Sequence, residues 1–335
     1  MPEASLVGVP RDTPILVTGA GGFIGGWMMR DLLENGFSNV LGVDVKPMDR
    51  WFQTPEGVET SQADLHDLQA ARLAVRDRQV IFNFAADMGG MGFIEANKAA
   101  CMTSVLINTN LLFAMEKTPE SRFFFASSAC VYNQSKQSVT EVQALVEDDA
   151  YPADPEDGYG WEKLFSERMV RHYAEDFGIQ GRVGRFHNVY GPHGSWGDGR
   201  EKAPAAICRK VAAAVVTGEP EIEIWGDGEQ TRSFTFVDDA LEGVQKLTFS
   251  GYGEPLNIGS SEMVSINQLV DVVEQIAGVH LKRKHILDAP LGVRGRNSDN
   301  ARVRKVLNWE PSTPLAQGLE RTYEWVYSQV ASEIA

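Results

Sequence analysis

The sequence has little cysteine and no long hydrophobic run. Only three cysteines, Cys101, Cys130 and Cys208, occur in 335 residues, which is too few and too scattered for a disulfide framework or a metal cluster. No apolar run reaches the roughly 18 residues of a membrane span, and the start of the chain lacks the basic-then-apolar pattern of a secretory signal. We therefore expect a cytoplasmic protein with no metal and no membrane partner.

Positive charge is also scarce. Lysine and arginine total 31 against 46 acidic residues, so the formal net charge is −15. This excess of acid argues against a general nucleic-acid binder or a protein that docks on anionic membranes. It leaves room for a local basic pocket that holds an anionic small molecule.

The most informative motif is a run of glycines near the start of the chain. The apolar residues 15–17 predict a strand, three glycines spaced three apart predict a tight turn, and the amphipathic residues 27–34 predict a helix. Glycines let the backbone approach a ligand closely, and the first amide groups of the helix stay free for a diphosphate. The candidate cofactor-binding residues of this turn are Gly19, Gly22, Phe23, Ile24 and Gly25.

Two acidic residues follow the next two predicted strands. Asp44 ends an apolar segment about 20 residues after the turn, where a carboxylate can bind a ribose 2′-hydroxyl and favour NAD over NADP. The alternative for Asp44 is a turn residue, and Lys46 and Arg50 lie close enough to attract a 2′-phosphate. Asp64 ends a further short strand, where a contact with adenine and a helix cap are both open.

Strand-like and helix-like segments alternate through the first half of the chain. The apolar runs at 80–87 and 122–127 predict parallel strands that are covered on both faces. Helical patterns cover about 96–116 and 159–177, and hairpin signals are missing. The sequence therefore predicts an α/β fold with a Rossmann-type doubly wound parallel sheet.

The second half of the chain changes character. Loops rich in glycine, proline and tryptophan occupy residues 187–200, and residues 221–225 alternate like an exposed strand. We assign residues 1–185 to an NAD-binding domain. Residues 186–335 then form mainly a smaller mixed α/β substrate domain, with some segments returning to the first. A ligand cleft is expected between them, at the carboxyl edge of the sheet.

A tyrosine and a lysine are placed for proton transfer. Tyr159 and Lys163 are four residues apart and therefore share one face of the predicted helix. The lysine charge can lower the pKa of the phenol, although a solvated helix face is the plain alternative. Ser128, at the end of the preceding strand, can offer a hydroxyl to the same substrate oxygen. Together with the glycine turn, this order resembles the extended short-chain dehydrogenase/reductase superfamily.

Several longer stretches resemble one family of that superfamily, the GDP-mannose 3,5-epimerases. The similarity covers about residues 13–327, whereas Ser104 replaces a usual asparagine and residues 133–148 diverge. The resemblance implies bound NAD, a GDP-sugar substrate and a homodimer built on the helices near 96–116 and 159–177. The stretches that carry it are residues 85–94, 127–132, 199–206, 226–236 and 292–300.

The residues themselves support such chemistry. If Tyr159 takes the proton of the hydroxyl at sugar carbon 4 while that carbon is oxidised, the ketone acidifies the protons on carbons 3 and 5. Inverting either carbon needs a base on one face and an acid on the other. Cys130 lies two residues beyond Ser128, and a thiolate is a competent base where positive charge lowers its pKa. Lys202 is the candidate acid, and in the family the matching positions have these roles.

Further residues are candidates for binding the substrate. Arg232 and Arg294 suit a diphosphate, with structural salt bridges as the alternative, and Arg296 is a further candidate. Trp225 can stack on a base or lie in the interior. The complete candidate set is Met88, Gly89, Gly90, Ser128, Asn188, Lys202, Trp225, Arg232 and Arg294.

Three other functions fit the sequence less well. A nucleotide-sugar 4-epimerase would leave Cys130 and Lys202 idle. A 4,6-dehydratase would need an Asp-Glu pair where this chain has Ala129 and Cys130. A non-catalytic NAD-binding regulator often lacks the tyrosine or lysine that this chain retains at 159 and 163.

Overall fold

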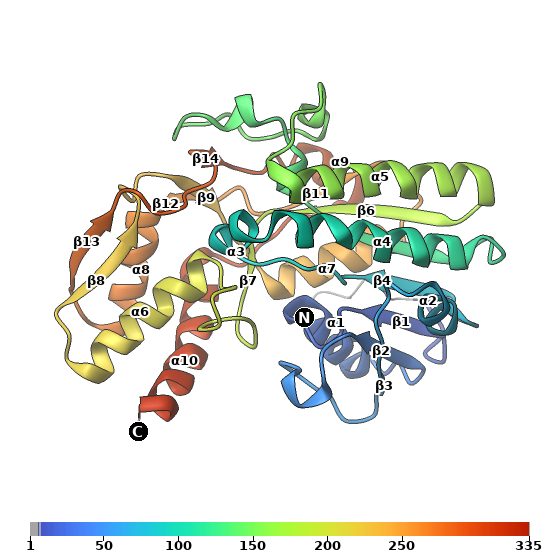
Figure 1. Cartoon of the computed structure of the whole chain (residues 1–335), viewed down its shortest axis with the longest axis horizontal. Helices are drawn as coiled ribbons and strands as arrows, with labels where there is room; N and C mark the ends of the chain where they lie inside the picture. Colours follow the sequence, from blue (N-terminus) through green and yellow to red (C-terminus); the bar gives the residue numbers. More distant parts are fainter. Residues whose placement is uncertain (1–5, 7, 335) are drawn as a thin grey trace.

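The larger lobe is built on one parallel sheet. The computed structural model describes residue 6 and residues 8–334. Seven strands run in the order β11-β6-β5-β4-β1-β2-β3, and every neighbouring pair is parallel. This confirms the predicted doubly wound sheet (Figure 1). Its strands are β1 (Ile15–Thr18), β2 (Val40–Asp44), β3 (Glu59–Gln62), β4 (Val80–Asn83), β5 (Arg122–Ser128), β6 (Gln180–Phe186) and β11 (Leu256–Ile258).

Helices cover both faces of this sheet because its strands are apolar on both sides. Phe123 and Phe125 of β5 face one hydrophobic cluster, with α2, α4 and α5, whereas Phe124 faces the other, with α1 and α7. Successive side chains of a strand point to opposite faces. Figure 1 shows α4 and α5 side by side over one face. The helices are α1 (Phe23–Glu34), α2 (Leu68–Val75), α4 (Lys98–Met115), α5 (Asp157–Phe177) and α7 (Val237–Thr248).

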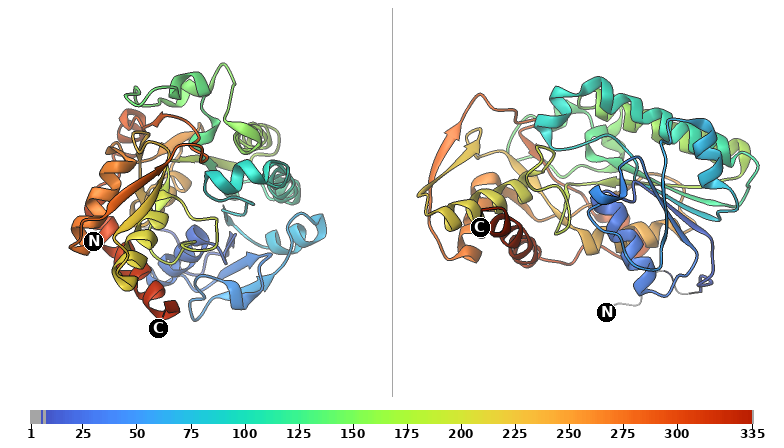
Figure 2. Two further views of the ribbon diagram at one scale, coloured as in Figure 1. Left: turned by 60° about the vertical axis from the view of Figure 1, so that its left-hand side comes forward. Right: turned by 60° about the horizontal axis from the view of Figure 1, so that its bottom comes forward.

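The smaller lobe lies at one end of the sheet, and its yellow-to-red segments stand apart in Figure 2. Three helices pack on one another there, beside two small sheets of order β13-β8 and β12-β9-β14. Strand β11 and helix α7, which also follow residue 185, lie with the large sheet. The elements of this half are β7 (Val189–Tyr190), α6 (Ala203–Thr217), β8 (Glu221–Trp225), β9 (Thr231–Ser233), β10 (Thr235–Phe236), β12 (Met263–Ser265), α8 (Ile266–Ala277), β13 (Lys282–Ile286), β14 (Gly295–Arg296), α9 (Ala301–Leu307) and α10 (Leu315–Ile334).

Two predicted elements differ from the observed ones. The strand expected at 80–87 ends at Asn83, whose side-chain oxygen accepts a hydrogen bond from the Thr18 hydroxyl at 2.8 Å. The helix expected from about residue 96 is preceded by a short helix, α3 (Met91–Ala96), and a break at Asn97. The Asn97 amide donates to the carbonyl of Phe93 at 2.9 Å, which ends α3 and turns the chain.

Two kinds of feature are absent from the described part of the chain. Among the residues that the structure describes, no helix is both long and apolar enough to cross a bilayer. Within residues 6 and 8–334, no three His, Cys, Asp or Glu side chains are grouped so that they could hold a metal ion.

Candidate functional site

The glycine turn is too tight for side chains and leaves the start of α1 open. A Cβ on Gly19 would lie 2.8 Å from the carbonyl carbon of Phe84, and one on Gly25 would collide with the carbonyl oxygen of Gly19. The N-cap of α1, Gly22, offers no side-chain hydrogen bond, and the first turn has no acidic residue. The free amide groups and the helix dipole therefore favour an anion. This geometry fits the diphosphate of a dinucleotide.

The other predicted residues of the turn lie in the first turn of α1. Phe23 faces the loop after β7, because a Cβ on Gly194 would lie 3.0 Å from its ring. Ile24 is half-buried and packs against the main core. The turn thus contacts the loop that leads toward the smaller lobe.

Asp44 lies at the end of β2 and is held beside the glycine turn. One of its carboxylate oxygens accepts a hydrogen bond from the Gly21 amide at 3.0 Å, and the other accepts one from the Lys46 amide at 2.9 Å. The Lys46 ammonium lies 4.5 Å from the centroid of the Phe52 ring. The carboxylate keeps lone pairs for a further donor such as a ribose hydroxyl.

The Trp51 ring packs against the glycine turn, and the sequence did not predict this contact. A Cβ on Gly21 would lie 2.5 Å from the Trp51 ring, and the indole nitrogen donates to the carbonyl of Lys46 at 3.0 Å. Trp51 is buried, although its neighbours form the turn-rich segment of a surface loop. The presence of a tryptophan in such a segment is the feature of the sequence that could have indicated a buried position.

Asp64 does not cap a helix. The N-cap of α2 is Asp67, whose carboxylate accepts a hydrogen bond from the Ala70 amide. The Asp64 carboxylate is exposed and bonds the amide and ring of His66. The backbone hydrogen bond of His66 lowers the pKa of Asp64. A contact with adenine stays a prediction for this residue.

Tyr159 and Lys163 are buried together on α5. The Lys163 nitrogen lies 5.5 Å from the centroid of the Tyr159 ring and 3.5 Å from a carboxylate oxygen of Glu162. Burial raises the pKa of Tyr159 well above its usual value, whereas a hydrogen bond with the Ser128 side chain opposes this shift. Ser128 ends β5, and its hydroxyl oxygen also accepts the Cys130 amide at 3.2 Å. The three residues predicted to act on one substrate oxygen therefore lie together.

Cys130 adjoins this group and contacts an arginine. The Arg296 guanidinium lies 3.5 Å from the Cys130 sulfur and also bonds the Gln137 amide oxygen and a Glu156 carboxylate oxygen, each at 2.6 Å. Burial raises the pKa of the Cys130 thiol, and the Arg296 charge lowers it. Glu156 and Gln137 were missed in the sequence, because nothing local in either residue predicts a contact with residue 296.

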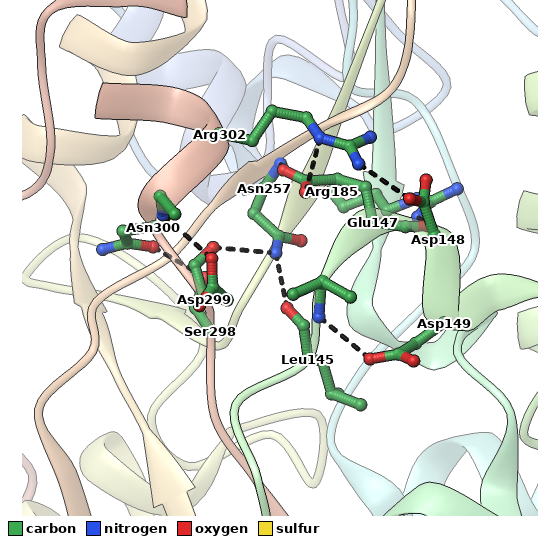
Figure 3. A network of polar contacts seen from close by, with 12 residues as sticks. Leu145, Glu147, Asp148, Asp149, Arg185, Asn257, Ser298, Asp299, Asn300 and Arg302 are labelled. Atoms are coloured by element: carbon green, nitrogen blue, oxygen red, sulfur yellow. Dashed lines mark hydrogen bonds and ion pairs between the residues drawn. The ribbon is translucent and has the colours of Figure 1, made fainter. Parts of the chain in front are cut away.

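A polar network places the segment that contains Arg296. The Asn257 amide donates to the carbonyls of Leu145 at 2.9 Å and Asp299 at 3.2 Å. Arg302 contacts Glu147 and Asp148, at 3.3 Å and 3.0 Å. Figure 3 shows these side chains joining the loop before α5 to the loop before α9. The network therefore holds residues 298–302, which follow Arg296, against residues 145–149.

Lys202 comes from the other lobe. It is the N-cap of α6, and burial lowers the pKa of its ammonium group, whereas the nearby Cys130 thiolate charge would raise it. Gly90 brings the predicted substrate segment Met88–Gly90 to the same place, because its amide donates to the carbonyl of Arg200 at 2.9 Å. The predicted base and acid thus lie near each other but belong to different lobes.

Arg232 and Arg294, two further predicted substrate residues, form hydrogen bonds within the protein through their guanidinium groups. Arg232 is largely buried and donates to the carbonyls of Thr231, Leu291 and Val293, and burial lowers its pKa to about 10. Arg294 forms two hydrogen bonds with Asp227, at 3.0 Å and 3.1 Å. The salt-bridge alternative is thus present for Arg294.

Asn188 and Trp225 are the last two predicted substrate residues. Asn188 has a φ of 46° and donates its side-chain amide to the carbonyl of Ser233 at 2.9 Å. The Trp225 ring ends β8 and is 46% exposed. Its position at the surface disagrees with the interior alternative and leaves the ring free to stack on a base.

Known proteins resemble this chain along nearly its whole length. A family model described as "NAD dependent epimerase/dehydratase family" matches residues 15–259. GDP-mannose 3,5-epimerase 1 of Oryza sativa subsp. indica is 46% identical over 95% of this chain and 83% of its own length. GDP-mannose 3,5-epimerase of Arabidopsis thaliana is 45% identical over 96% of this chain and 84% of its own.

Solved structures share the fold. UDP-glucose 4-epimerase of Thermotoga maritima, solved with UDP-glucose, is 25% identical, with a TM-score of 0.84 over 95% of this chain and 100% of that chain. UDP-glucuronic acid 4-epimerase of Bacillus cereus, in complex with UDP-glucuronic acid and NAD, is 26% identical, with a TM-score of 0.79 and the same coverage.

Proposed function

The chain belongs to the NAD dependent epimerase/dehydratase family. We propose that it epimerises GDP-mannose at carbons 3 and 5 to GDP-L-galactose, with GDP-L-gulose as a second product. The observation that carries the proposal is the second acid–base pair. Cys130 lies beside Tyr159 at the end of β5, and Lys202 approaches from the other lobe. A 4-epimerase needs only the tyrosine pair.

The tyrosine group handles the oxygen on carbon 4. The glycine turn and Asp44 would hold the cofactor NAD, which when bound would supply the hydride acceptor and donor for carbon 4. Tyr159 accepts the proton of the carbon 4 hydroxyl while Ser128 hydrogen-bonds the same oxygen. The Lys163 ammonium, 5.5 Å from the ring centroid, stabilises the phenolate that must form.

The cysteine and lysine invert the neighbouring carbons. With a ketone at carbon 4, the Cys130 thiolate takes a proton from carbon 3 or 5, and the Lys202 ammonium gives one to the opposite face. Each inversion therefore moves one proton from carbon to sulfur and one from nitrogen to carbon, so the number of protons on the sugar is unchanged. Proton exchange with solvent restores the thiolate and the ammonium before the next step.

Exchange with solvent tests this function directly. The holoenzyme is incubated with GDP-mannose in deuterated water, and the product is analysed by NMR. Deuterium is expected at carbons 3 and 5 and not at carbon 4. A product inverted only at carbon 4 without solvent deuterium would identify a 4-epimerase instead, and an unchanged sugar would point to a regulator.

We also propose that two copies of the chain pair through α4 and α5. Met102 and Leu106 of α4, and Trp161 and Phe165 of α5, are between 47% and 54% exposed. In each helix the two side chains are four residues apart and share one face, so two apolar faces lie next to each other on the outer surface. A second copy covers such a surface by symmetry. Sedimentation should give a homodimer, and a Phe165→Glu variant should sediment as a monomer.

We further propose that the protein works in the cytoplasm with its thiols reduced. Cys101, Cys130 and Cys208 are all buried and free of disulfide bonds, and a thiolate base is lost on oxidation. Fractionation of the source cells should recover the activity with cytoplasmic enzymes.

A further inference from the structure

Two loops from opposite lobes are joined by an ion pair. Asp87 follows β4, and Arg200 lies in the loop that leads into α6. A guanidinium nitrogen of Arg200 lies 2.7 Å from a carboxylate oxygen of Asp87 and 3.3 Å from the carbonyl of Met88. The guanidinium carbon also lies 3.9 Å from the centroid of the Phe93 ring, a cation–π contact. One side chain thus makes three contacts with the sheet lobe.

The backbones of the same two loops also meet. The Gly90 amide donates to the carbonyl oxygen of Arg200 at 2.9 Å. A Cβ on Gly90 would lie 2.5 Å from the carbonyl oxygen of Glu201, closer than a real side chain allows. Glycine is therefore required for the loops to approach this closely.

The two residues before Lys202 have different partners. Arg200 contacts the sheet lobe, and its own amide donates to a carboxylate oxygen of Asp198 at 3.0 Å. Glu201 turns to α6, where its carboxylate lies 3.0 Å from the Arg209 guanidinium. Lys202 follows as the N-cap of α6. The backbone that carries Lys202 is thus held through the two residues that precede it.

The proposed chemistry makes this placement matter. The base, Cys130, belongs to the sheet lobe, whereas the acid, Lys202, belongs to the loop before α6. The distance across the sugar between base and acid therefore depends on how the two lobes are joined. An error of about 1 Å in such an arrangement can cost about 100-fold in rate.

We propose that Arg200 and Asp87 are positioning residues that hold the Lys202 ammonium at the face of the sugar opposite Cys130. This inference rests on the function proposed above. Neither residue exchanges a proton with the sugar; they act through the loop that ends at Lys202.

The strength of the ion pair allows a clean test. The side chains of Arg200 and Asp87 are 41% and 37% exposed, and an exposed pair typically contributes no more than about 1 kcal/mol to folding. Breaking the pair should therefore leave the protein folded. The matched control is the pair of Arg321 and Asp238, which are 44% and 47% exposed and 2.6 Å apart on α10 and α7.

The experiment separates the two halves of the reaction in the holoenzyme. Single-turnover absorbance of reduced nicotinamide measures oxidation at carbon 4, and deuterium incorporation measures proton transfer at carbons 3 and 5. In Asp87→Asn and Arg200→Gln, we expect incorporation to fall about 10-fold or more, with oxidation within about twofold of the wild type. The double variant should be no worse than either single variant, because the two residues act as one unit. Arg200→Lys, which keeps a charge for Asp87, should retain more incorporation than Arg200→Gln.

Each other outcome overturns the inference. If the variants incorporate deuterium as fast as the wild type and the Asp238→Asn control, the ion pair does not position Lys202, and the proposed function stands. A parallel fall in oxidation and incorporation would mean a general loss of structure in place of a positioning role. A wild-type enzyme that incorporates no deuterium would overturn both the inference and the proposed function.

Discussion

Arg296 contacts Cys130 across 166 residues of sequence, with a guanidinium nitrogen 3.5 Å from the sulfur. Both side chains are buried, and the nearby charges are three cations, Arg232, Arg296 and Lys202, against one carboxylate, Glu156. A buried group of charges is costly when it is unbalanced. A thiolate on Cys130 would reduce this excess of positive charge. The pKa of the thiol therefore reflects a balance in which burial raises it and the Arg296 charge lowers it.

The first prediction follows from that balance. Replacing Arg296 by Gln removes the charge that lowers the pKa of the Cys130 thiol, while burial still raises that pKa. Iodoacetamide alkylates Cys130 faster as the thiol ionises, so its rate rises with pH. The midpoint of this rise should lie at a higher pH in Arg296→Gln than in the wild type. Arg304→Gln, which breaks an ion pair with Glu310 on the surface, is the control. Identical profiles in all three proteins would show that Arg296 does not tune the thiol.

A second prediction concerns the base itself. Cys130→Ser keeps the size of the side chain, but a serine hydroxyl does not ionise near neutral pH. We expect deuterium incorporation at carbons 3 and 5 to fall about 100-fold or more, the size of a general-base contribution. Oxidation at carbon 4 should persist, because Tyr159 and Lys163 are unchanged. NMR of the sugar and absorbance of the reduced cofactor measure the two steps, and an unchanged incorporation rate would refute the base assignment.

The sheet, and the candidate residues at the carboxyl ends of its strands, could be predicted from the sequence for a physical reason. Apolar runs alternating with helical patterns specify parallel strands, whose carboxyl ends share one edge of the sheet. Ser128 ends one strand, with Cys130 two residues later, and Asp44 ends another. The order of these residues along the chain therefore predicted that they lie at the same edge of the sheet. The helix spacing of Tyr159 and Lys163 similarly placed both side chains on one face.

Contacts that join distant loops could not be predicted from the sequence. Arg296 was only one of several candidate arginines, and its partners Gln137 and Glu156 carry no local pattern that points to it. At the break, Asn97 donates hydrogen bonds from its side chain to Phe93 and from its backbone amide to Ile94, and helical periodicity does not reveal these contacts. Tertiary contacts decide these positions, and one sequence without its fold does not specify them.

A third prediction concerns the choice of cofactor. The buried Asp44 carboxylate accepts hydrogen bonds from the Gly21 and Lys46 amides, and its charge repels a 2′-phosphate. In Asp44→Asn the side-chain shape stays but the charge is lost. We expect the preference for NAD over NADP to fall about 10-fold or more, corresponding to about 1.4 kcal/mol of lost discrimination. Titration of the protein with each cofactor by calorimetry measures the ratio, and an unchanged ratio would assign the choice to other residues.

The last prediction links a buried histidine to stability in acid. His187 is fully buried, with a ring nitrogen 3.0 Å from the Asn257 amide oxygen, and burial lowers its pKa to about 3. An unfolded histidine has a pKa of about 6.5, so between these values the unfolded chain binds a proton that the folded chain does not. The contribution to stability is therefore complete above about pH 6.5 and is lost as the pH falls toward about 3. In His187→Gln, the free energy of urea unfolding should fall less steeply across this range, by up to about 1.4 kcal/mol for each pH unit. A matched change at His280, whose side chain is 90% exposed, controls for the loss of a histidine, and equal slopes in His187→Gln and the wild type would contradict the prediction.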